Sequence, residues 1–192
     1  LGRGILMTGD PATEFMKVKP RRSITVPFDL PPAAMNRLRC IEREMDNNDT
    51  EETMDLETAC PDKLVDAEAA VSKIKNGCRV FIGTGCGEPQ HLIRTMVEDM
   101  NMQDIMVYQM LSWTFADYVD DPRFLKRFSL KLFFISATMR KAAFEGKIDY
   151  VPTYLSQIPR FFANRRIGLD VALIQVSPPD AFGLVSLGIS VD

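Results

Sequence analysis

The glycine-rich heptapeptide Gly83–Pro89 (GTGCGEP) is the arrangement of residues in this sequence that most suggests chemistry. Its three glycines allow the backbone to approach a ligand closely, and amides at the start of a following helix would favour an anion or an oxyanion. The pattern is not the dinucleotide fingerprint G-x-G-x-x-G, and no Lys-Ser or Lys-Thr pair follows that would make it a P-loop. A tight strand-to-helix turn that merely requires glycine explains the same residues, so both interpretations stay open.

Two side chains of this heptapeptide are candidate nucleophiles. Glu88 could attack a substrate or act as a base, but a glutamate in the first turn of a helix more often complements the helix dipole, and we favour that role. Cys86 would be stabilised as a thiolate at a helix start. Its one candidate base, His91, follows five residues later and not quite on the same helical face, so we favour a small buried cysteine.

A second candidate loop, Ser177–Gly183 (SPPDAFG), follows the most apolar run of the chain. Its two prolines fix the backbone, and Asp180 can hold a turn through its side chain. Such a rigid loop suits a substrate wall and equally suits a plain hairpin turn.

A third loop contains Ser156 beside two other polar residues, Tyr154 and Gln157. No histidine or acid stands nearby in the sequence to activate Ser156 as a nucleophile. We therefore favour a helix N-cap for this serine.

Apolar runs of strand length alternate with segments of helical periodicity from Leu64 onward. Because the strands are apolar on both faces, this order predicts an α/β fold with a mostly parallel sheet and helices on both faces. Ligands bind beyond the carboxyl ends of strands in such sheets, so we expect a site among residues 83–89, 111–122, 152–159 and 177–183. The predicted strands are 78–83, 105–111, 129–136, 149–151, 170–176 and 184–190, and the predicted helices are 67–75, 89–100, 137–146 and 156–164.

Residues 1–62 differ from the rest of the chain. Prolines interrupt this part, and an acidic run from Glu42 to Glu57 is typical of a linker. We predict an irregular amino-terminal arm and acidic linker over 1–62, with a short strand at Arg22–Phe28 and a helix at Pro32–Glu44, and one α/β domain over 63–192.

Composition disfavours several classes of protein. The formal net charge of −3 argues against a nucleic-acid binder, and no apolar stretch approaches the roughly 20 residues of a membrane span. The four cysteines form no C-x-x-C pair and the chain has one histidine, which disfavours a zinc site. We expect reduced thiols, no metal and a cytoplasmic protein.

Three segments of the chain, read together, resemble the acetyl-CoA hydrolase/transferase family, which includes the 4-hydroxybutyrate and butyrate CoA-transferases. They are Gly83–Pro89, Val151–Pro159 (VPTYLSQIP) and, above all, Asp170–Asp192 (DVALIQVSPPDAFGLVSLGISVD). The resemblance implies the first of two α/β domains that face each other across an active-site cleft. It also implies chemistry through a glutamate that attacks an acyl-CoA thioester and passes through a glutamyl-CoA intermediate.

The family's glutamate falls in a segment that this sequence does not include, so the resemblance implies no catalytic residue here and an inactive 192-residue chain. It implies coenzyme A as acyl-CoA substrate, a small carboxylate such as acetate or 4-hydroxybutyrate, and the carboxy-terminal domain as partner, with a homo-oligomer as a further expectation. The residues expected to line the acyl or carboxylate side of the pocket are Gly85, Gly87, Glu88, Pro89, Ser156, Pro178, Asp180 and Gly183.

Two other functions remain as alternatives. The first is a non-catalytic acyl-CoA or nucleotide binding module, which a natural protein without a second-domain glutamate would favour. The second is a thiol enzyme that uses Cys86. Within the leading hypothesis, hydrolase and transferase are both open, because water or a carboxylate could be the acceptor.

Overall fold

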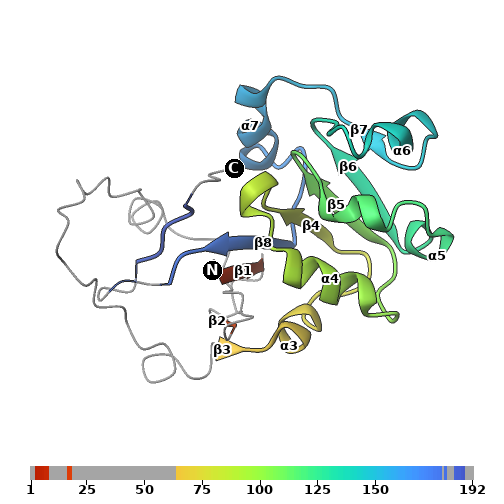
Figure 1. The fold of residues 1–192 in the computed structure, drawn as a ribbon. Coiled ribbons are helices and arrows are strands. Elements are labelled where there is room, and N and C mark those ends of the chain that lie inside the picture. Colours follow the sequence, from red (N-terminus) through yellow and green to blue (C-terminus); the bar gives the residue numbers. More distant parts are fainter. Residues whose placement is uncertain (1–2, 9–16, 19–63, 179, 181–183, 189–192) are drawn as a thin grey trace.

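The described residues of the computed structural model are 3–8, 17–18, 64–178, 180 and 184–188, and they contain a six-stranded sheet (Figure 1). Five strands run parallel, and the first pairs antiparallel with β8 from Arg3↔Val176 to Thr8↔Val171. The α/β fold with a mostly parallel sheet is thereby confirmed. In sheet order the strands are β1 (Arg3–Thr8), β8 (Val171–Val176), β4 (Arg79–Ile82), β5 (Ile105–Gln109), β6 (Phe128–Leu132) and β7 (Asp149–Tyr150).

Both faces of this sheet are covered. In β4, Val80 and Ile82 belong to one hydrophobic cluster and Phe81 belongs to another, and successive side chains of a strand point to opposite faces. The larger cluster takes buried residues from four helices and the smaller one from α7 (Ile158–Ala163). The four helices are α3 (Ala67–Val71), α4 (Gln90–Glu98), α5 (Pro122–Leu125) and α6 (Arg140–Phe144).

The order of the strands creates a switch point between β4 and β8. From β4 the chain adds β5, β6 and β7 in succession on one side, and then returns through α7 to place β8 on the other side of β4 (Figure 1). A sheet of this kind opens a crevice at the carboxyl ends of the two diverging strands. Two candidate loops, 83–89 and 177–183, follow these two strands.

Local signals fix several helix ends. Asp66 is the N-cap of α3, and its carboxylate accepts a hydrogen bond from the Ala69 amide at 2.7 Å. The helix ends at Val71, short of the predicted end at residue 75. Helix α4 buries four apolar side chains, which are Leu92, Ile93, Met96 and Val97.

One predicted strand is wrong. Residues 184–188 form no strand. The chain instead turns back on the preceding loop, where the Ser177 amide donates to the Ser186 carbonyl and the Asp180 amide donates to the Leu184 carbonyl, both at 2.9 Å. Pro178 has no amide hydrogen to donate, so this loop cannot offer residues 184–188 the regular partner that a sheet strand needs.

Other elements were not predicted or lie elsewhere. The sequence interpretation contained neither β1 nor α5, nor the 3-10 helix η4 (Thr114–Asp117). A further short parallel pair joins β2 (Lys17–Val18) to β3 (Leu64–Val65). The strand expected at 22–28 and the helix expected at 32–44 lie outside the described residues, so the division of the chain at residue 62 stays a prediction.

Candidate functional site

Buried polar residues gather at the carboxyl edge of the sheet. Of the seven buried polar or charged residues among those described, six lie at or just beyond the ends of β4, β5 and β6. Burying a polar group is costly unless it is hydrogen-bonded, so this concentration marks a specifically built region. The six are Thr84, Glu88, Gln109, Ser112, Thr114 and Ser136, and the seventh is Arg127.

The Glu88 carboxylate is the centre of this region. Its side chain is 3% exposed. One oxygen, Oε1, accepts from Gln109 Nε2 at 2.8 Å and from the Trp113 amide at 3.3 Å. The other, Oε2, accepts from the Thr114 amide at 3.1 Å and from Thr114 Oγ1 at 2.6 Å. Glu88 thus ties the glycine-rich loop to the loop that follows β5.

This arrangement differs from both roles that the sequence suggested for Glu88. The carboxylate faces the amides at the start of η4 and not those of α4, so the helix end that it complements belongs to the next loop. With both oxygens occupied by four donors and almost no exposed surface, it is not presented to a substrate as a nucleophile.

Gln109, the last residue of β5, helps to hold the Glu88 carboxylate in place. Its Nε2 also donates to the Gly83 carbonyl at 3.2 Å, and two acceptor partners fix which end of the amide is nitrogen. Among the described residues, Gln109 Oε1 and Ser112 Oγ are the buried side-chain oxygens without a hydrogen-bond partner. Such atoms cost roughly 1–3 kcal/mol each, and both lie at this edge.

The glycine-rich loop is a compact turn. Gly83 donates its amide to the Leu173 carbonyl at 2.9 Å, and a Cβ at Gly83 would lie 3.4 Å from the Gly87 carbonyl oxygen. The 3-10 turn η3 (Gly85–Gly87) needs glycine at its first residue, where φ is +57°. The Gly87 and Glu88 amides donate to the Thr84 and Gly85 carbonyls, so these two amides serve the turn and do not face outward.

The predicted site residues divide by accessibility. Ser156 and Pro178 are exposed, and Gly85 and Asp180 are half-buried. Three others, Gly87, Glu88 and Pro89, are buried behind the loop surface, and Gly183 lies outside the described residues.

Two local expectations have different outcomes. The Asp180 Oδ1 atom accepts from the Leu184 amide at 2.9 Å, which holds the turn as predicted. Ser156 is not the N-cap of α7: it lies within the 3-10 turn η5 (Leu155–Gln157), and Gln157 takes the cap position.

The preference for a buried Cys86 is also wrong, because the side chain is exposed. His91 is exposed as well. Within the part of the chain that the structure describes, no hydrogen bond joins the two. The thiol-enzyme hypothesis therefore gains no geometric support.

Sequence reasoning missed five residues outside the glycine-rich loop at this edge: Gln109, Ser112, Trp113, Thr114 and Ser136. The loop 111–122 was named as a place to look, but no side chain in it was selected. The available signal was Gln109 itself, an amide at the end of an otherwise apolar run, IMVYQML.

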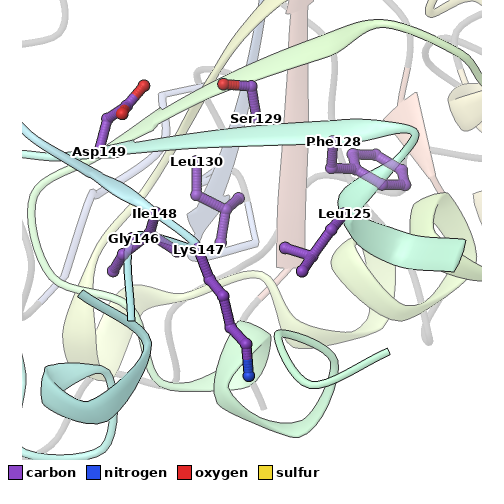
Figure 2. Close-up of a pocket in the computed structure, with 8 residues that line it drawn as sticks. All are labelled: Leu125, Phe128, Ser129, Leu130, Gly146, Lys147, Ile148 and Asp149. Carbon is purple, nitrogen blue, oxygen red and sulfur yellow. The ribbon is translucent and has the colours of Figure 1, made fainter. Parts of the chain in front are cut away.

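A hollow at the opposite edge is separate from this region. Figure 2 shows it lined by the starts of β6 and β7 and by the turn before β7. The Lys147 ammonium points away from Ser129 and Asp149 in this view and pairs with Asp120 and Glu145. The charged residues of the hollow are therefore engaged with surface partners, and the hollow does not connect with the carboxyl edge.

The described residues contain no group of three or more His, Cys, Asp or Glu placed to hold a metal ion. None of their helices is both long and apolar enough to cross a membrane.

The parallel sheet and the polar region at its carboxyl edge define an α/β domain with a candidate site at that edge, and comparisons with known proteins specify its family. Residues 45–192 match the acetyl-CoA hydrolase/transferase N-terminal domain. The chain therefore belongs to the acetyl-CoA hydrolase/transferase family, as the resemblance of its three segments predicts.

Its relatives are CoA-transferases. A 4-hydroxybutyrate coenzyme A transferase of Clostridium kluyveri is 35% identical over 140 residues, which are 72% of this chain and 32% of that protein. A succinyl-CoA:acetate/propanoyl-CoA:succinate CoA transferase of Fasciola hepatica is 38% identical over 122 residues, which are 62% of this chain and 25% of that protein. The chain thus spans about a third or less of each.

A solved structure shares the fold. The crystal structure of RipA from Yersinia pestis aligns with a TM-score of 0.59 and 27% identity, over 71% of this chain and 34% of RipA. The alignment again covers only a part of the larger protein.

Proposed function

We propose that the natural protein containing this chain moves coenzyme A from an acyl-CoA to a small carboxylic acid, or releases free coenzyme A from it by hydrolysis. The observation that carries this proposal is the family match over residues 45–192, and the names of the two relatives agree with it. We place the reaction in the cytoplasm. The partners of the chain are the acyl-CoA, the carboxylate and its own carboxy-terminal domain, with a homo-oligomer as the expected assembly.

The chemistry proceeds through a glutamate that lies outside these 192 residues. Its carboxylate attacks the thioester carbonyl, the CoA thiolate leaves and a mixed anhydride forms. The thiolate then attacks the glutamyl carbonyl, which releases the first acid and leaves a glutamyl-CoA thioester. An acceptor carboxylate reverses these two steps with a new acyl group, whereas water hydrolyses the thioester to glutamate and free CoA.

The geometry of Glu88 supports placing the nucleophile elsewhere. A nucleophilic carboxylate needs an oxygen that can reach the substrate, and both oxygens of Glu88 are engaged with protein donors in a buried position. Glu88 was the one acid in the glycine-rich loop that suggested this role.

The chain itself contributes the substrate side of the cleft. Gly85, Ser156, Pro178 and Asp180 have accessible surface on loops that follow the sheet strands, so they would touch the acyl group or the carboxylate. The buried residues Gly87, Glu88 and Pro89 would shape the loop from behind. Gly183 stays a predicted member of this set, and no metal takes part.

Isotope exchange tests this function. The natural full-length protein is given acetyl-CoA or butyryl-CoA as the CoA donor, with labelled acetate or 4-hydroxybutyrate as the acceptor, and the 192-residue chain is assayed beside it. We expect exchange or hydrolysis by the long protein and none by the short one. Exchange by the short chain would contradict the placement of the nucleophile, and binding of acyl-CoA without turnover by the long protein would favour the non-catalytic module.

A further inference from the structure

Trp113 is the chain's one tryptophan, and its side chain is 46% exposed although both of its neighbours are buried. Ser112 is fully buried and Thr114 is 6% exposed. The residue follows β5 at the carboxyl edge, beside the loop that follows β4. A large indole is thus held at the surface by a backbone segment that is itself locked into the interior.

Buried hydrogen bonds hold this segment in place from two sides. The Glu88 carboxylate accepts from the amides of Trp113 and Thr114 and from the Thr114 hydroxyl. On the other side, the Ser112 carbonyl accepts from Ser136 Oγ at 2.8 Å. The backbone from which the indole projects is therefore fixed by hydrogen bonds to the neighbouring loops.

The same bonds couple Trp113 to the glycine-rich loop. Glu88 belongs to that loop, and Thr84 Oγ1 accepts from the Met110 amide at 3.3 Å, which joins the two loops a second time. Gly85 and Cys86 have accessible surface on one side of this connection, and Trp113 is the large exposed apolar residue on the other.

An exposed aromatic side chain on a fixed backbone beside a polar turn suits a ligand with an apolar portion next to a reacting carbonyl. We propose that Trp113 forms an apolar wall for the acyl end of the acyl-CoA, and that Glu88 is the positioning residue that holds it there. This inference rests on the proposed function. It assigns the indole to the acyl end, and not to the adenine, because its anchor lies in the loop expected to line the acyl side.

Enzyme kinetics of the full-length protein test the wall. We expect Trp113→Ala to raise KM for butyryl-CoA about tenfold, the size typical of truncating a contact aromatic, and to raise KM for acetyl-CoA less, because a shorter acyl group touches less of the wall. Trp113→Phe should recover most of the loss. The control is Phe144→Ala, since Phe144 is 86% exposed on α6, outside the carboxyl-edge loops.

Fluorine NMR of the protein labelled with fluorotryptophan tests the contact directly. The Trp113 signal is assigned by its loss in Trp113→Phe, which also separates it from tryptophans elsewhere in the natural protein. We expect butyryl-CoA to shift this signal and adenosine monophosphate to leave it in place. An equal shift with the adenine nucleotide would overturn the assignment to the acyl end.

The positioning role of Glu88 requires a different pair of variants. Glu88→Gln places an amide group among four donors, so at least one donor loses its acceptor. We expect the free-protein Trp113 signal to move and KM for butyryl-CoA to rise about tenfold with a smaller change in kcat. The control is Glu98→Gln, an exposed glutamate of α4.

A milder variant covers the case in which Glu88→Gln fails to fold. Thr114→Val removes one of the four bonds to the carboxylate and should move the Trp113 signal in the same direction. An active enzyme whose KM and Trp113 signal respond to none of these changes would overturn the inference and leave the proposed function intact. A full-length protein with neither acyl-CoA binding nor turnover would overturn both.

Discussion

At the scale of single residues, burial decides what each member of the glycine-rich loop can do. Glu88 and Cys86 stand two positions apart, and the sequence presents both as candidate nucleophiles. In the fold, Glu88 is 3% exposed and bonded to the next loop, whereas Cys86 lies at the surface. Cys86 lies within a three-residue 3-10 turn and Glu88 directly follows it, so neither residue belongs to a long helix or strand. Hydrophobic periodicity could therefore not tell the inward side chain from the outward one.

The thiols provide a prediction at this scale. Partial burial raises the pKa of the Cys78 thiol, because the charged thiolate loses hydration there. A raised pKa means less thiolate at neutral pH, so we expect iodoacetamide to alkylate Cys86 about tenfold faster than Cys78. The rate at Cys78 should keep rising as the pH moves further into the alkaline range.

Peptide mass spectrometry at successive times measures both rates in the same sample. Cys86→Ser serves as the control that assigns the fast site. Equal rates at Cys78 and Cys86 at neutral pH would contradict the burial described for Cys78.

At the scale of elements, apolar runs predicted where the parallel strands lie, but for four of the five strands they placed the carboxyl end too late. The run predicted as 129–136 remains in the sheet only to Leu132. Phe133 lies beyond the end of the regular strand, and its amide donates to the Gln109 carbonyl. Its side chain is nevertheless fully buried. Apolarity reports burial and not strand pairing, so the sequence could not show where the chain leaves the sheet.

Short elements were missed for a related reason. Helix α5 begins with a recognisable signal, because Asp121 caps it and Pro122 occupies its first turn. Its four residues are too few to establish a helical period. The loop that carries η4 and α5 therefore stayed unresolved in the sequence interpretation, and with it the partners of Glu88.

Arg127 supplies a prediction for these elements. It is 6% exposed and donates to the carbonyls of Val97 and Asp99 at the carboxyl end of α4, at 2.8 and 2.9 Å. Lysine lacks the planar fork that reaches both, so Arg127→Lys should reduce the local free energy of opening at the end of α4 by about 2 kcal/mol.

Amide hydrogen exchange over residues 90–99 of the full-length protein measures this quantity. The matched control is Arg123→Lys, since the Arg123 side chain is 78% exposed and pairs with Asp121 at the surface. The control should change protection by less than roughly 0.5 kcal/mol. An equal effect of the two variants would contradict the structural role of Arg127.

At the scale of the whole molecule, the topology brings together loops that the sequence keeps far apart. The ends of β4 and β8 become neighbours because the chain returns through α7 before it forms β8. This pairing places 83–89 beside the loop that starts at Ser177. The expected α/β fold fixed which loops to inspect. It did not predict that a buried carboxylate would join two of them, because that contact depends on long-range strand order.

We propose that this chain lines the substrate side of a CoA-transferring enzyme whose nucleophilic glutamate lies elsewhere in the natural protein. The most direct measurement locates the CoA-bound residue. The full-length protein is incubated with acetyl-CoA, treated with borohydride to reduce the glutamyl thioester to an alcohol, digested and mapped by mass spectrometry. The account predicts one reduced glutamate in a peptide outside residues 1–192, and a reduced glutamate at position 88 would contradict it.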